Sequence, residues 1–152
     1  ARDSGTGIVA VAAEYGIAIT AQVEEEVLEG KKDKLGDALL VERLVKEGKL
    51  KVIDIDKKLS QKVADDFNMG KGEASTIAAA IKGKCIAATD NRQGRKAAMV
   101  NNIPLVGSPE IVVSLCREKM ITKEKATDAL KVLKEEGWFD QHIIEKAMED
   151  VK

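Results

Sequence analysis

The sequence predicts an α/β fold in which a mostly parallel sheet is covered by helices on both faces. Short apolar runs alternate with amphipathic helical patterns along most of the chain, and glycines separate many of them. Such alternation is typical of parallel strands joined by helices. The 152 residues contain no low-complexity linker, and 44% of them are apolar. We therefore expect one domain over residues 1–152, with a core at about 1–121 and a C-terminal helical extension at about 122–152.

The first half of the chain is expected to contain two strands and three helices. The alanine-rich segment 8–13 fits either a helix or a strand, so its state stays open. Helices are predicted where apolar residues recur every three or four positions, and Gly30 and Gly48 mark two of their ends. In order, the expected elements are a strand at 16–20, a helix at 23–28, a loop at 31–34, a helix at 37–47, a strand at 50–55 and a helix carrying Leu59, Val63 and Phe67.

The second half shows a clearer alternation of helices and strands. Gly83 and Gly137 mark helix ends. Ser108 is expected to cap a helix with Pro109 at its first position, where the missing N–H costs nothing. The expected elements are a helix at 73–81, a buried strand at 85–89, a helix at 92–100, a strand at 103–106, the helix capped by Ser108, and helices at 122–136 and 140–151.

Two acidic residues occur where a ligand site is expected. Asp90 follows the apolar run 85–89, so its carboxylate would lie at the carboxyl end of a buried strand, where open α/β sheets bind ligands. Glu73 begins the preceding helix directly after Gly70-Lys71-Gly72. With cations nearby, the two acids suggest a divalent-metal site that acts on a phosphate. Each also has a simpler interpretation: Asp90 as the cap of the helix that begins at Arg92, and Glu73 as a complement to a helix dipole.

Three other residues are weaker candidates for chemistry. Glu26 lies in an acidic run, but its place beside Val27 allows it to point inward from the apolar stripe of its helix. Asp3 occurs in Asp3-Ser4-Gly5-Thr6, which equally describes a frayed chain end. His142 is the only histidine, which excludes a histidine-rich metal site, and we expect it to be structural or at the surface.

Composition limits the classes of function. The chain has 25 basic and 26 acidic residues and a net charge of -1, so a nucleic-acid partner requires a local basic patch. Its four aromatic residues argue against stacking platforms for single-stranded nucleic acid. No apolar run approaches the ~20 residues of a membrane span and no secretory signal is visible, so we expect a cytoplasmic protein that does not enter a membrane. Cys85 and Cys116 are therefore expected to be reduced core residues.

Several segments carry a resemblance to a known family. They are Gly70-Lys71-Gly72-Glu73-Ala74-Ser75-Thr76-Ile77-Ala78, Ile86-Ala87-Ala88-Thr89-Asp90-Asn91-Arg92-Gln93-Gly94-Arg95-Lys96-Ala97-Ala98, Asn102-Ile103-Pro104-Leu105-Val106-Gly107-Ser108 and Val23-Glu24-Glu25-Glu26-Val27. In this order and spacing they resemble the PIN-domain family, most closely the PIN-like nucleic-acid-binding branch related to VapC toxins. The resemblance covers about residues 15–121.

The resemblance implies a three-layer α/β/α sandwich and an activity. Active members of the family are Mg²⁺- or Mn²⁺-dependent ribonucleases, which would make this chain a prokaryotic, toxin-like endoribonuclease with RNA as substrate. An antitoxin protein and a second copy of the chain would be its protein partners. By motif, the catalytic and metal-binding acids would be Asp3, Glu26, Glu73 and Asp90. The RNA phosphates would be held by Lys71, Arg92, Arg95 and Lys96, which equally describe a solvated helix face.

Two departures from the family pattern keep alternatives open. No strand precedes Asp3, and Asn91 stands where this branch often has a second acid. The chain is therefore alternatively a catalytically weak or inactive PIN-like module that binds RNA or a protein partner. A third hypothesis is a role in assembly, as a homodimer or with an antitoxin, through the segment 8–13 and the C-terminal helices.

Overall fold

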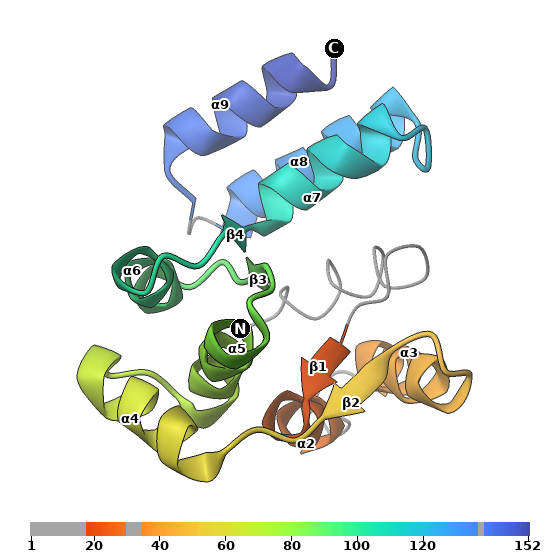
Figure 1. Cartoon of the computed structure of the whole chain (residues 1–152). Coiled ribbons are helices and arrows are strands. Elements are labelled where there is room, and N and C mark those ends of the chain that lie inside the picture. Colours follow the sequence, from red (N-terminus) through yellow and green to blue (C-terminus); the bar gives the residue numbers. More distant parts are fainter. Residues whose placement is uncertain (1–17, 30–34, 137–138) are drawn as a thin grey trace. The chain divides into compact units, whose positions relative to one another are not determined.

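The computed structural model describes residues 18–29, 35–136 and 139–152 (Figure 1). The predictions for Asp3, for the segment 8–13, for the loop 31–34 and for the helix ends at Gly30 and Gly137 lie outside the described residues. The elements are β1 (Ala18–Thr20), α2 (Ala21–Glu29), α3 (Leu35–Lys46), β2 (Lys51–Ile53), α4 (Lys57–Phe67), α5 (Lys71–Gly83), β3 (Ala87–Ala88), α6 (Arg92–Val100), β4 (Leu105–Val106), α7 (Ser108–Arg117), α8 (Lys123–Glu136) and α9 (Gln141–Asp150).

The chain groups into two compact units. We call Ala1–Val106 the N-terminal unit and Gly107–Lys152 the C-terminal unit. Helix α7, which the sequence placed with the core, groups with α8 and α9 instead. The single-domain organisation over residues 1–152 stays a prediction.

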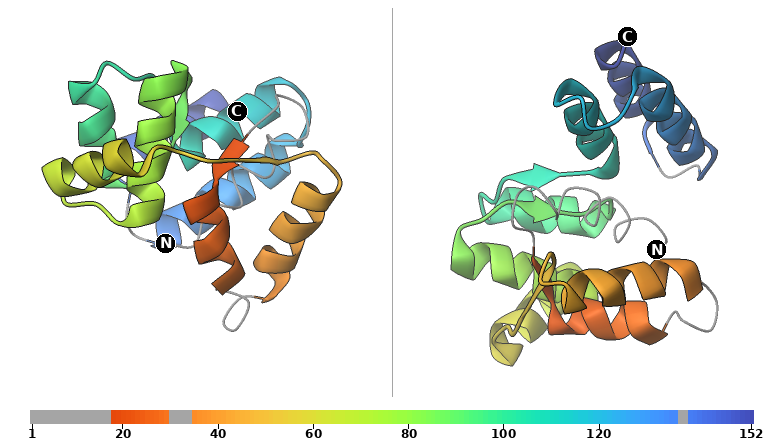
Figure 2. Two further views of the ribbon diagram at one scale, coloured as in Figure 1. Left: turned by 60° about the horizontal axis from the view of Figure 1, so that its bottom comes forward. Right: turned by 90° about the vertical axis from the view of Figure 1, so that its right-hand side faces the viewer.

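The described strands are short and pair in parallel. Strand β1 pairs with β2, with Ile19 opposite Val52, and β3 pairs with β4, with Ala87 opposite Leu105. Figure 2 shows β1 and β2 side by side, next to α2 and α3. The parallel pairing is as predicted, but within the described residues the four strands form two separate pairs rather than one sheet.

Helix α5 supplies much of the core of the N-terminal unit. Ala74, Ile77 and Ala78 are at most 1% exposed, and α4 packs along the same helix through Val63. The small side chains of Ala74 and Ala78 let neighbouring backbones approach closely. A second cluster around Leu50 buries the inner faces of β1 and α3.

The apolar run before Asp90 is less buried than predicted. Strand β3 is limited to Ala87–Ala88, and Ile86 is 65% exposed. Cys85 is also exposed and Cys116 is half-buried, so the expectation of two core cysteines is wrong for Cys85. Both are free thiols, because neither forms a disulfide.

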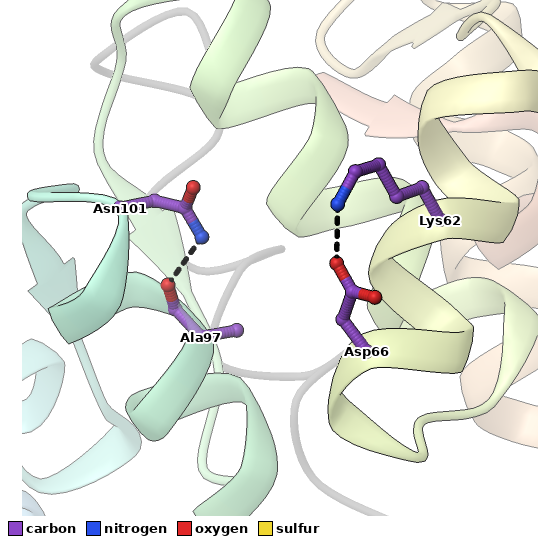
Figure 3. A network of polar contacts seen from close by, with 4 residues as sticks. All are labelled: Lys62, Asp66, Ala97 and Asn101. Atoms are coloured by element: carbon purple, nitrogen blue, oxygen red, sulfur yellow. Dashed lines mark hydrogen bonds and ion pairs between the residues drawn. The ribbon is translucent and has the colours of Figure 1, made fainter.

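Two helix caps lie one residue away from their predicted positions. The side chain of Asn91, rather than that of Asp90, caps α6 by accepting from the N–H groups of Gln93 and Gly94. Helix α7 begins at Ser108 with Gly107 as its cap, so Pro109 is its second residue. At the other end of α6, Asn101 donates to the carbonyl of Ala97 (Figure 3).

Apolar contacts hold the C-terminal unit together. Leu130 of α8 is fully buried, and Val113 of α7 and Ile144 of α9 pack in the same cluster. Phe139, in the connection to α9, packs against this cluster as well. His142 is exposed on α9, which confirms its assignment to the surface.

Candidate functional site

The first turn of α5 is the centre of the candidate site. Gly70 is its cap residue and has no side chain that could accept a hydrogen bond from the free N–H groups of the helix start. The carboxylate of Glu26, from α2, accepts the N–H of Gly72 at 3.0 Å. An acid 46 residues away thus caps this helix, and the positive end of the helix dipole stabilises its charge.

Gly72 allows this approach because it lacks a side chain. A Cβ at this position would lie 2.5 Å from Oε2 of Glu26, well inside van der Waals contact. Any other residue would displace the Glu26 carboxylate. The glycine before Glu73 is therefore part of the site rather than only a turn residue.

A buried chain of hydroxyl groups fixes α2 against α5. The N–H of Val23 donates to Oγ1 of Thr20, which lies 2.6 Å from Oγ of Ser75, and Ser75 donates to the carbonyl of Gly72 at 2.7 Å. Because a serine hydroxyl has one hydrogen, Thr20 must donate to Ser75. Thr20 is 2% exposed and Ser75 is fully buried, so these bonds are shielded from water. They set the position from which Glu26 reaches Gly72.

Glu73 lies beside Glu26 and is held by Asn91. The Nδ2 group of Asn91 donates to Oε1 of Glu73 at 3.0 Å, while Oδ1 of the same side chain caps α6. Asn91 therefore links the start of α6 to the start of α5. Together, Glu26, Gly72, Glu73 and Asn91 form what we call the acidic site.

The acidic site alters the protonation of Glu73. Burial raises the pKa of the Glu73 carboxyl above its usual 4.5, the negative charge of Glu26 raises this pKa further, and the hydrogen bond from Asn91 lowers it. Glu73 therefore keeps its proton to a higher pH than an unperturbed glutamate does.

The structure brings together two of the four predicted acids. Glu26 and Glu73 meet at the start of α5, and Asp90 immediately precedes Asn91, two residues beyond the end of β3. Asp3 lies outside the described residues. Within the described ranges, no group of three or more histidine, cysteine, aspartate or glutamate side chains is arranged to hold a metal ion.

The predicted cations surround the starts of the same two helices. Lys71 is exposed at the first position of α5, and Arg92 and Lys96 are exposed on α6. Arg95 is half-buried on α6. Gly94, Ala97 and Ala98 form the buried face of α6, which leaves this basic face towards solvent. Among the described residues, none of the four cations forms an ion pair with an acid.

Sequence reasoning missed four of the residues that build the site. Gly72 was interpreted as a turn residue and Asn91 as a departure from the family pattern, and Thr20 and Ser75 were not among the predicted site residues. An asparagine directly before a helix is a recognisable cap signal, so the capping role of Asn91 was accessible. The contacts across 46 and 55 residues had no local signal.

A comparison with protein families decides the family of this chain. A family model described as a PIN domain matches residues 9–152. The chain belongs to the PIN-domain family. The match extends through both units of this PIN domain and confirms the α/β, PIN-like fold class predicted from the sequence. No curated protein and no solved structure matches the chain.

PIN domains generally use divalent metal ions, and the two described acids fit part of that requirement. Oε1 of Glu26 and Oε1 of Glu73 each accept one hydrogen bond, and within the described part of the chain their second oxygens have no partner. Mg²⁺ is often bound by only one or two carboxylates, completed by waters and substrate phosphate. Two oxygen donors therefore suit a hard cation, although they form a smaller set than the predicted four acids.

None of the described helices combines the length and the apolar character that crossing a membrane requires.

Proposed function

We propose that this PIN domain is a metal-dependent endoribonuclease of the toxin type, which hydrolyses phosphodiester bonds in RNA. The observation that supports the proposal is the pair of carboxylates, Glu26 and Glu73, held side by side at the start of α5 by Gly72 and Asn91. Two neighbouring carboxylates repel one another when both are charged, and a bound divalent cation would relieve this repulsion.

Each residue has a distinct task in this proposal. Glu26 and Glu73 would hold Mg²⁺ or Mn²⁺ through their second oxygens, with Asp90 and Asp3 as further ligands. When bound, the ion would polarise a phosphoryl oxygen and lower the pKa of a water molecule. Because the pKa of Glu73 is raised, the metal ion would have to displace a proton that this carboxyl holds to a higher pH than an exposed glutamate does.

The four predicted cations would bind and orient the RNA. Lys71, Arg92, Arg95 and Lys96 lie on the helices whose first turns form the acidic site. Contacts of such cations to phosphate oxygens fix the register of a strand without reading its sequence. The bond to be cleaved would therefore be selected by position and by RNA structure.

The test of this function is a cleavage assay with matched variants. We expect the wild-type protein to cleave RNA in Mg²⁺ or Mn²⁺, and excess EDTA or the substitution Asp90→Asn to abolish cleavage. Glu26→Gln should also abolish it, whereas Glu25→Gln, one residue earlier and exposed on the same helix, should leave it unchanged. Full activity of Asp90→Asn, or activity that survives EDTA, would refute the proposal.

A second candidate is a catalytically inactive PIN-like module that binds RNA or a protein. It is favoured by Asn91, whose amide stands beside Glu73 where an acid would add a metal ligand, and by the two-acid arrangement of the described residues. Salt-dependent RNA binding without cleavage, combined with no heat of Mn²⁺ binding in calorimetry, would support this candidate over the nuclease.

The toxin assignment carries further proposals about partners and location. We propose a cytoplasmic, prokaryotic setting, a homodimeric state and an antitoxin protein that covers the acidic site. Sedimentation of the purified protein tests the dimer, and a strictly monomeric result would refute the homodimeric state.

A further inference from the structure

The C-terminal unit contains an open hollow with an unusual excess of positive charge. The hollow has a volume of about 550 Å³ and lies at the turn from α7 to α8, next to the last residues of the chain. Its charged lining residues are Arg117, Lys119, Lys123, Lys125, Lys152 and Asp150. Five cations therefore face a single acid, in a protein whose net charge is -1. We call it the basic hollow.

Three of these cations lack an acidic partner among the described residues. Arg117 lies 4.0 Å from Asp150, and Lys152 lies 3.3 Å from Glu149. Lys119, Lys123 and Lys125 are exposed and form no ion pair within the described part of the chain. These three lysines repel one another, and a bound anion would relieve that repulsion.

A second hollow in the same unit shows that this charge is not a general property of its surface. That hollow has a volume of about 530 Å³ and lies along α9. It is lined by two cations, Lys134 and Lys152, and by two acids, Glu145 and Glu149, so its formal charges balance. Of two spaces of similar size, only the basic hollow therefore has a net charge that favours an anion.

We propose that the basic hollow binds successive phosphates of an RNA strand. The inference rests on the proposed function, because an RNA substrate is the polyanion on which the acidic site would act. A row of unpaired lysines suits a flexible phosphate chain, since each lysine contacts a phosphate as a point charge and requires no fixed geometry. The first turn of α8, which carries Lys123 and Lys125, adds the positive end of a helix dipole to the same hollow.

The experiment measures RNA binding in EDTA, so that cleavage is not required. A short, fluorescently labelled single-stranded RNA is titrated with the wild-type protein and with the triple variant Lys119→Gln, Lys123→Gln, Lys125→Gln. The control variant Lys131→Gln, Lys134→Gln, Lys146→Gln removes the same charge from exposed positions of the same unit outside the basic hollow. Circular dichroism and thermal melting establish that both variants are folded.

The expected results separate this inference from the proposed nuclease. The hollow variant should bind RNA about tenfold more weakly, with a salt slope reduced by about 2, because each lost contact to a single strand removes about 0.7 from that slope. The control should bind within about twofold of the wild type. RNA that is bound through the hollow but never cleaved would support the inference and reject the nuclease, whereas cleavage with equal binding by both variants would do the reverse.

A second arm distinguishes RNA from free phosphate. Titration of the ¹⁵N-labelled protein with the RNA should shift the amide signals of residues 119–125 at concentrations where inorganic phosphate alone leaves them unchanged. If inorganic phosphate shifts these signals as effectively as RNA, the hollow is a small-anion site and the inference is overturned. The inference also fails if the wild-type protein does not bind RNA.

Discussion

The acidic site and the core of the C-terminal unit are held together by different kinds of interaction. In the acidic site and the hydroxyl chain beside it, side-chain hydrogen bonds join β1, α2 and the start of α6 to α5 across 55, 46 and 18 residues. In the C-terminal unit, the side-chain hydrogen bonds of Thr122, Thr127, Asp140 and Gln141 each span at most four residues. Apolar packing connects the three helices, with one long ion pair between Arg117 and Asp150. Directional bonds fix where atoms lie, whereas apolar burial is non-directional and contributes most of the stability. Substitutions in the two regions should therefore have different consequences.

The largest effect on stability is expected from a cavity in the C-terminal unit. Leu130→Ala removes a fully buried side chain between α7, α8 and α9, and should lower the free energy of unfolding by about 2–5 kcal/mol. Val132→Ala, at a 55% exposed position of the same helix, is the matched control and should change little. Chemical denaturation gives both values, and hydrogen exchange should show lost protection in α7–α9. Equal values for the two variants would contradict the comparison.

A smaller loss is expected from the hydroxyl chain of the acidic site. Ser75→Ala leaves the buried Thr20 hydroxyl without its acceptor and should cost about 1–3 kcal/mol. Because Thr20 positions the start of α2, the Glu26 carboxylate should also become less ordered. Denaturation measures the first effect, and the amide shift of Gly72 in an NMR spectrum reports the second. An unchanged Gly72 signal would show that the hydroxyl chain stabilises α2 without positioning Glu26.

Replacing Asn91 tests charge separately from capping. Asn91→Asp retains an oxygen that caps α6, but it removes the donor to Glu73 and adds a third carboxylate, so it should destabilise the metal-free protein by about 1 kcal/mol at neutral pH. Under the proposed function it should also bind Mn²⁺ more tightly. Asn91→Ser, which caps without a charge, should share neither the repulsion nor the gain in affinity. Calorimetry with Mn²⁺ and thermal melting distinguish the two variants.

The smallest expected effect is a pH dependence that arises from Glu73. An acid whose pKa is raised on folding binds more protons in the folded state, so stability falls as pH rises from the unfolded value of about 4.5 through the folded pKa, and then levels off. Glu73→Gln keeps an oxygen for Asn91 and removes this titration. The variant should therefore gain melting temperature relative to wild type at pH 7 but not at pH 4. A difference of the opposite sign would show that the folded protein favours the charged carboxylate.

The elements were predictable where the local pattern determines them. Helix α6 has its predicted bounds, 92–100, because small buried residues alternate with charged ones at helical spacing. Helix α5 begins at Lys71, two residues earlier than predicted, because Glu26 supplies from another helix the cap that Gly70 lacks. Strand β3 is shorter than its apolar run, since strand length depends on the partner strand, which local pattern does not reveal.

The site was predictable in its residue types but not in its connections. Glu26 and Glu73 were identified through a family resemblance, and their proximity through the N–H of Gly72 is tertiary information. Asn91 was interpreted as a position where the family often has an acid. In the structure its side-chain amide binds Glu73 at the start of α5 and caps the start of α6. The basic hollow was not predicted, because acidic residues alternate with its cations along the sequence. The excess of positive charge is evident only from the residues that line the hollow in the folded chain.

The contacts of Gly72 limit which amino-acid substitutions this protein tolerates. Its N–H binds Glu26 of α2, and its carbonyl accepts from Ser75, which in turn contacts Thr20 of β1. One glycine of α5 is therefore bonded to α2 directly and to β1 through one side chain. Substituting a larger residue at this point would leave every carboxylate in the sequence and still separate the pair. Variation among natural versions of this chain should therefore be more restricted at a position with no side chain than at many of the charged positions around it.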